Sequence, residues 1–309
     1  METMYLTHPA CRLHEMGSWH PESPQRLDAI SDQLLASGLM PYLDDRQAPQ
    51  ASRHDLLRVH TVQYLDSLRE HTPDQGYYPI DPDTLMNPHT YEAALHAAGA
   101  GVAAVDAVMG GEARTAFCAV RPPGHHACRS QAMGFCFLNN VAIAARHALD
   151  FHGLSRVAIV DFDVHHGNGT EDVFAGDDRV LMCSFFQHPF FPNSGTEHPA
   201  ANMLNVPVAA YTTGAAVKTI VTDTWLPRLE AHRPELILVS AGFDAHREDD
   251  MGQMGLVEAD YAWITEQLVD VAERHCQGRI VSTLEGGYNL SALGPVSYTH
   301  LTLPTTPYV

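Results

Sequence analysis

Five short stretches of β-branched and apolar residues are almost continuously hydrophobic, and this feature constrains the fold most strongly. Strands buried on both faces of a parallel sheet have this composition. The stretches are 115–120, 157–164, 180–186, 236–240 and 280–284. Apolar residues recur with helical spacing in segments 23–37, 89–109, 138–151, 215–229 and 258–275. This alternation predicts a single doubly wound α/β domain, with a mostly parallel central sheet flanked by helices.

Charge and cysteine content limit the expected partners and environment. The chain has 309 residues, of which 37 are acidic and 18 are basic, for a formal net charge of -19. We find no segregated basic patch, so nucleic acid is not an expected partner. No apolar run approaches the ~18 residues of a membrane span, and the N-terminus lacks a secretory signal pattern. Six cysteines without a Cys-x-x-Cys pair indicate reduced thiols in the cytoplasm.

A polar cluster follows each of the five predicted strands. In an open α/β sheet, ligands bind at the carboxyl ends of the strands. Five such clusters therefore indicate one functional site in a shared crevice. They occupy segments 121–126, 161–169, 190–192, 241–246 and 285–288.

Asp161, Asp163 and His165 have the spacing that places side chains on one face of an extended strand. Burying unpaired carboxylates there would cost roughly several kcal/mol, and a divalent cation would remove that cost. We predict a metal site of Asp163 and His165, with Asp244 as third ligand and one position open for water. Such an oxygen-rich set suits Zn²⁺ and also accepts Fe²⁺, Co²⁺ or Mn²⁺. The alternative to a metal site is an exposed loop of solvated acids and imidazoles at residues 161–165. For Asp244, the alternative is a helix-capping aspartate.

His125 and His126 are adjacent imidazoles in a turn stiffened by proline and glycine. Neutral histidine is the most common general base near pH 7, and a carboxylate partner fixes its tautomer. Asp161 is a suitable partner for one ring and Asn168 for the other. A purely structural role is the alternative for this pair.

Three aromatic residues complete the predicted site. Tyr288 follows two glycines, and its phenol can stabilise a developing oxyanion. Phe135 and Phe191 lie on loops at the same end of the sheet, where they can wall a narrow apolar tunnel. A core position is the more ordinary alternative for such aromatics.

These stretches resemble the histone deacetylase family, whose members share the arginase-deacetylase fold. Asn168 stands where another branch of the family has aspartate, so the sequence is most similar to the class II and bacterial deacetylase-like amidohydrolases. The matches occur in the family's order and span the chain to about Leu290. The matching segments are 20–26, 121–127, 133–140, 161–170, 191–192, 240–246 and 284–288.

The resemblance implies a zinc-dependent mechanism. Asp163, His165 and Asp244 would bind Zn²⁺, and His126 would act as general base toward the metal's water and later as general acid. His125, paired with Asp161, would be its electrostatic partner. The remaining implied roles are a hydrogen bond from His126 to Asn168 and polarisation of the acyl carbonyl by Tyr288.

The resemblance also implies substrate and potassium sites. Phe135 and Phe191 would flank the acyl-lysine stem, the Gly134 carbonyl would accept its amide N–H, and Met251 would line the wall. Arg26 would lie near the family's acetate-release cavity. A structural K⁺ would be held by backbone oxygens near Asp161, Asp163, His165 and Ser184.

The last 14 residues depart from the family pattern. Segment 296–309 is rich in threonine and proline, and we expect it to lack a helix and to pack poorly. We interpret it as a non-native tail attached to a catalytic domain of residues 1–295.

The leading functional hypothesis is hydrolysis of an acetyl or short-acyl amide on a lysine-like amine, in a peptide, a protein or a small molecule. Acetylpolyamines or other small amides are the second possibility. A binuclear arginase-like hydrolase would need more bridging aspartates, and a non-catalytic acyl-lysine binder would be expected to lack a ligand, the base or the tyrosine. The sequence does not indicate an oligomeric state.

Overall fold

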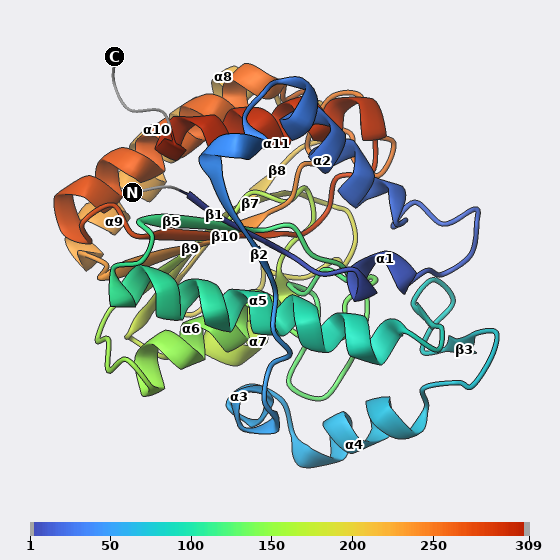
Figure 1. The fold of residues 1–309 in the computed structure, drawn as a ribbon. Coiled ribbons are helices and arrows are strands. Elements are labelled where there is room, and N and C mark those ends of the chain that lie inside the picture. The colour runs from blue at the N-terminus through green and yellow to red at the C-terminus, as the bar shows by residue number, and fades with distance from the viewer. Residues whose placement is uncertain (1–2, 306–309) are drawn as a thin grey trace.

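The computed structural model describes residues 3–305, with side chains to residue 302, around an eight-stranded sheet (Figure 1). The strand order is β2-β1-β5-β10-β9-β6-β7-β8, and each adjacent pair is parallel. The strands are β1 (Thr3–Thr7), β2 (Leu43–Gln47), β5 (Thr115–Cys118), β6 (Val157–Asp161), β7 (Val180–Gln187), β8 (Met203–Val208), β9 (Leu236–Ala241) and β10 (Ile280–Leu284). The predicted doubly wound α/β architecture is confirmed.

Helices cover both faces of this sheet (Figure 1). One layer contains α2 (Gln25–Ala36), α8 (Gly214–Ile220), α9 (Leu226–His232), α10 (Glu258–His275) and α11 (Leu290–Thr305). The other contains α5 (Thr90–Gly110), α6 (Asn140–Asp150) and α7 (Asn168–Phe174). The shorter elements are α1 (Ala10–Leu13), η1 (Met40–Tyr42), α3 (Arg53–Leu57), α4 (Val62–Glu70), the hairpin of β3 (Tyr78–Pro79) and β4 (Leu85–Met86), and the π-helical turn η2 (Val221–Trp225).

Helix α5 is the one described helix long and apolar enough to cross a membrane, with a mean hydropathy of 1.4. However, 67% of that apolar window is buried inside the protein, as expected of a core helix. The helix ends at Gly110 and is capped by Gly111, whose φ of 75° is left-handed and therefore favours glycine.

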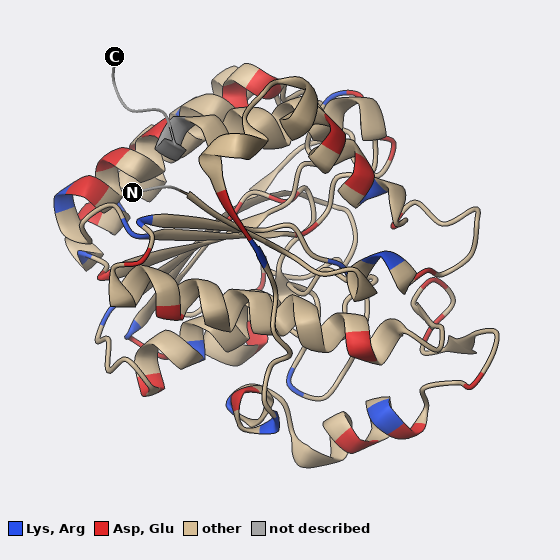
Figure 2. Ribbon diagram, viewed as in Figure 1, with Lys and Arg blue, Asp and Glu red and all other residues tan. Residues whose placement is uncertain are grey.

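Charged residues avoid the centre of the sheet (Figure 2). The edge strand β2 carries Asp44, Asp45 and Arg46, and the central strand β6 has a charged residue, Asp161, only at its last position. Charges on an exposed edge discourage pairing with another chain. Basic residues are scattered among acidic ones in this view.

The prediction that segment 296–309 lacks a helix and packs poorly is wrong for its described part. Residues 290–305 form α11, which packs against α2 and α10. Leu293, Val296, His300 and Leu301 recur at steps of three, four and one, and all four are buried. This helical period extends across residue 296, so the proposed domain boundary does not mark a structural break. Residues 306–309 of the predicted tail lie outside the described residues.

Candidate active site

The five predicted polar clusters follow five consecutive strands of the sheet. These strands are β5, β10, β9, β6 and β7, and all are parallel. Their carboxyl ends therefore lie along one edge, as the sequence predicts for a common site.

Three buried side chains at this edge form a candidate metal centre. His165 Nδ1 lies 3.1 Å from Asp163 Oδ1 and 3.2 Å from Asp244 Oδ2. One ligand atom from each residue lies within 4.8 Å of the other two. Asp163 and His165 follow β6, and Asp244 follows the neighbouring β9. The structure thus brings together the three predicted ligands.

Backbone turns, rather than an extended strand, bring the first two ligands to the site. β6 ends at Asp161, so the prediction that Asp163 and His165 continue the strand is wrong. Asp161 Oδ1 accepts the N–H of Asp163 at 3.1 Å, and Asp163 Oδ1 accepts that of His165 at 2.9 Å. Aspartate commonly stabilises turns by accepting a backbone N–H two residues on.

The donor set fits a divalent cation. Asp244 Oδ2 is buried and faces His165 Nδ1 at 3.2 Å as an ion-pair partner, but it has no hydrogen bond among the described residues. A Cβ on Gly286 would collide with the carboxylates of Asp244 and Asp163, which glycine leaves accessible. Burial lowers the pKa of His165, but both carboxylates outweigh this effect and raise it to about 10. The same excess of buried negative charge attracts a metal ion.

The two adjacent histidines have different partners. His125 Nδ1 lies 2.9 Å from Asp161 Oδ2, and His126 Nδ1 lies 2.8 Å from Asn168 Oδ1. An amide oxygen only accepts, so His126 carries its hydrogen on Nδ1 and keeps Nε2 as an acceptor. The structure contains both predicted pairings.

The surrounding charges separate the pKa values of these two rings. Burial lowers the pKa of His125, but nearby carboxylates, Asp161 first, outweigh it and raise the pKa well above its ordinary value. Burial and the charges of His125 and His165 hold the pKa of His126 well below its ordinary value. Near pH 7, His126 is therefore neutral and able to accept a proton, whereas His125 is charged.

Several contacts fix Tyr288. Its backbone N–H donates to Asp249 Oδ2 at 2.6 Å, and its ring lies edge-on to Phe135 with centroids 5.9 Å apart. The guanidinium carbon of Arg26 lies 4.8 Å from the Tyr288 ring centroid. Burial raises the pKa of Tyr288 well above its ordinary value, so the phenol stays protonated and can donate a hydrogen bond.

One cavity of about 220 Å³ joins these groups with the predicted tunnel residues. Gly134 has a left-handed φ of 56°, and a Cβ there would collide with the His126 ring. The wall therefore requires glycine at this position. The residues that line the cavity are Asp83, His126, Gly134, Phe135, His165, Phe190, Phe191, Asp250, Met251 and Tyr288.

Two other predicted residues, Arg26 and Ser184, are not among the residues that line the cavity. Arg26 is buried and donates to the carbonyls of Gly287 at 2.6 Å and Glu285 at 2.5 Å, so it supports the segment that carries Tyr288. Ser184 lies on β7 as the register partner of Asp161 on β6. The acetate-release role of Arg26 and the K⁺ site at Asp161, Asp163, His165 and Ser184 stay predictions.

Sequence reasoning assigned no role to Glu285. Its carboxylate accepts the backbone N–H groups of Gly124 at 2.7 Å and His125 at 3.0 Å, and the Ser240 hydroxyl at 3.0 Å. It thereby fixes the turn that carries the histidine pair, and burial raises its pKa to about 7. Its position directly after β10 was the available signal. Sequence reasoning also missed Asp83 and Asp250, because they lie in loops that carry no recognisable sequence signal.

Buried carboxylates, imidazoles and a phenol at the ends of parallel strands form a site suited to amide hydrolysis, on a sheet that matches the arginase-deacetylase fold. The chain belongs to the histone deacetylase family, because the family's histone deacetylase domain model matches residues 20–303. It is accordingly an enzyme of the deacetylase and amidohydrolase class.

Individual relatives support this assignment. A histone deacetylase-like amidohydrolase of Pseudomonas aeruginosa is 41% identical, and the match covers 87% of this chain and 73% of that protein. A probable deacetylase of Archaeoglobus fulgidus is 36% identical over 97% of this chain and 85% of its own length. The crystal structure of the HDA15 HD domain has a TM-score of 0.91 and 32% identity, covering 98% of this chain and 90% of that one.

Proposed function

We propose that this enzyme removes an acetyl or other short acyl group from a lysine-like amine. One observation carries the proposal: neutral His126, the Tyr288 phenol and His165 of the metal cluster line the same cavity. The aromatic walls formed by Phe135 and Phe191 suit a linear alkyl stem with an amide at its tip.

Asp163, His165 and Asp244 would hold Zn²⁺, with Fe²⁺, Co²⁺ or Mn²⁺ as other candidates. When bound, the ion supplies Lewis acidity that polarises the acyl carbonyl and makes a water molecule more acidic. The buried donor atoms of these three residues, which all lie within 4.8 Å of one another, and the close approach of both carboxylates to Gly286 support this assignment.

The remaining residues move protons and orient the substrate. His126 Nε2 accepts the proton of the attacking water and later delivers it to the leaving amine. The charged His125–Asp161 pair sets the electrostatic environment of that ring, and Asn168 fixes its tautomer. The Tyr288 hydroxyl donates to the developing oxyanion. The Gly134 carbonyl accepts the amide N–H of the substrate.

A second candidate substrate class is an acylated small amine such as an acetylpolyamine. Asp83 and Asp250 line the cavity, and two carboxylates there favour a substrate with an additional positive charge. This observation also suits basic peptides, so it does not displace the first proposal.

Steady-state rates on acyl-lysine peptides of increasing acyl length and on acetylpolyamines test both proposals, with metal analysis of the same sample. We expect the highest kcat/KM on an acetyl-lysine or short-acyl-lysine peptide. Preference for acetylpolyamines would favour the second class. A metal-loaded protein that hydrolyses none of these amides would contradict both.

A further inference from the structure

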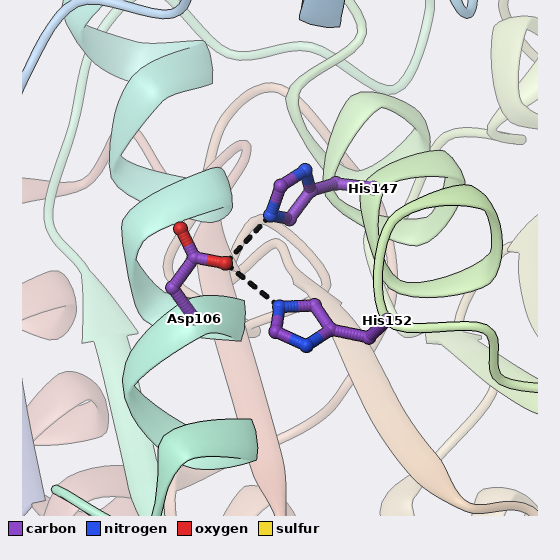
Figure 3. A group of neighbouring side chains, drawn as sticks. All are labelled: Asp106, His147 and His152. Atoms are coloured by element: carbon purple, nitrogen blue, oxygen red, sulfur yellow. Dashed lines mark hydrogen bonds and ion pairs between the residues drawn. The ribbon is translucent and has the colours of Figure 1, made fainter.

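A second group of metal-ligating side chains lies between α5 and α6 (Figure 3). Asp106 belongs to α5, His147 to the last turn of α6, and His152 follows that helix. Asp106 Oδ1 lies 2.6 Å from His147 Nε2 and 2.7 Å from His152 Nε2. One ligand atom of each residue lies within 4.8 Å of the other two. Two imidazoles and one carboxylate are a recurrent protein donor set for zinc.

This group lies near the amino ends of the sheet's strands, whereas the candidate active site lies at their carboxyl ends. α5 ends shortly before β5 begins at Thr115, and His152 shortly precedes the start of β6 at Val157. The candidate catalytic residues follow the other ends of these same strands. An ion bound by Asp106 would therefore not touch the substrate cavity.

We propose that Asp106, His147 and His152 form a second binding site for a divalent transition-metal ion such as Zn²⁺. Imidazole nitrogens favour Zn²⁺, Ni²⁺, Co²⁺ and Cu²⁺ over Mg²⁺ and Ca²⁺, which prefer all-oxygen sites. The site is open to solvent on the Asp106 side, where the side chain is 49% exposed, against 6% for His147. An ion can enter from this side, and water can complete its coordination.

The surroundings of His147 orient its ring toward Asp106. Arg58 Nη1 lies 2.7 Å from His147 Nδ1, so in the ion-free ring the hydrogen is on Nε2 and points to Asp106. Metal binding at Nε2 requires that hydrogen on Nδ1, so Arg58 has to turn away from this nitrogen. Asp55 Oδ1, now bonded to Arg58 at 3.0 Å, lies 3.7 Å from Nδ1 and is the carboxylate placed to orient the metal-bound ring. Phe151 stacks on the His147 ring with centroids 4.8 Å apart and restricts its rotation.

Such an ion would link α5 to the end of α6. A ligand that binds the folded chain and not the unfolded chain raises stability according to its concentration. The site is therefore a stabilising clip between two helices of one layer, independent of the proposed catalytic metal.

The test is to load the untagged chain with Zn²⁺, remove free metal by desalting, and count bound zinc per chain by mass spectrometry. We expect His152→Ala and Asp106→Asn each to lose one equivalent relative to wild type, with acetyl-lysine hydrolysis unchanged. His71→Ala removes an exposed histidine outside the group and should lose none. Melting temperatures should rise with added Zn²⁺ in wild type more than in either site variant.

The asparagine variant keeps the shape of the side chain, so its fold can be checked by melting in the presence of a chelator. Equal zinc content in wild type, His152→Ala and Asp106→Asn would overturn the proposal. Because both site variants keep the Asp163–His165–Asp244 cluster, this result is independent of whether the proposed deacetylase function is correct.

Discussion

His126 Nδ1 lies 2.8 Å from Asn168 Oδ1, and this contact determines which nitrogen of His126 is left to accept a proton. An amide oxygen fixes the ring without adding negative charge beside it. Burial and the charge of His125 can therefore keep the pKa of His126 low. The consequence is a base that is neutral at physiological pH.

This arrangement predicts the acid limb of the pH–rate profile. The base must be neutral, so activity falls only when the pH drops through its lowered pKa. We expect the acid limb of kcat/KM, which reports on the free enzyme, to lie below the ordinary histidine value of ~6.5. Asn168→Asp adds a carboxylate beside the ring, raises its pKa and should move this limb to higher pH. Identical profiles for the two chains would argue against the role of His126.

Removal of the base separates proton transfer from metal binding. His126→Ala should reduce kcat/KM by roughly 10²–10⁴, the usual contribution of general acid–base catalysis. Its zinc content should match that of wild type, because the predicted ligands are intact. Turnover of a fluorogenic acetyl-lysine peptide measures the loss of activity, and metal analysis of the same sample measures the zinc content. Wild-type turnover in the variant would refute the base assignment.

Tyr288→Phe removes one hydroxyl and keeps the ring that packs against Phe135 and Arg26. Loss of an oxyanion donor typically lowers kcat by about 10²–10³. We expect a drop of this order with little change in KM or melting temperature. Tyr77→Phe, at an exposed position, is the matched control. A variant of Tyr288 that is as active as this control would show that the phenol does not act in the reaction.

His300 connects α11 to the core, with its two ring nitrogens 2.8 Å from the hydroxyls of Thr265 and Ser282. Burial lowers the pKa of His300 to about 4. Between pH 6.5 and 4, the unfolded chain therefore binds a proton that the folded chain does not. The free energy of unfolding should fall across this window, by at most about 3 kcal/mol from this group.

Thermal melts of wild type and His300→Gln from pH 7 to 4.5 measure this contribution. Other buried histidines with a lowered pKa, such as His60, affect the stability of wild type and variant alike. The difference between the two stability curves therefore isolates the contribution of His300. We expect the variant to lose less stability on acidification. Parallel curves would mean that His300 does not titrate as its buried position requires.

The centre of the sheet could be predicted from the sequence, because strands buried on both faces are continuously apolar. The edge strands of the sheet could not be predicted in this way. β2 carries three charged residues, and β8 contains Pro207, which argues against a strand by composition alone. In α11, threonine and proline content obscured a helical period that runs through Val296 and Leu301. Tertiary burial against α2 and α10 outweighs the weak helix propensity there.

The candidate site was more predictable than the fold's edges, because its residues follow strand ends and carry distinctive chemistry. Asp163, His165 and Asp244 meet although the sequence assigned the first two to a strand instead of turns. Glu285 was missed because its function is to hold backbone N–H groups of another loop. Its place directly after a strand signals the site, but the contact with a distant segment that gives it its role leaves no local pattern.

The account depends on Asp163, His165 and Asp244 holding one ion that amide hydrolysis requires. The most direct test measures zinc content and acetyl-lysine turnover on the same samples of wild type, Asp244→Ala and the exposed control Asp178→Ala. We predict that Asp244→Ala loses one equivalent of zinc together with its activity, while Asp178→Ala keeps both. An Asp244→Ala enzyme that retains its full zinc content and turnover would contradict the account.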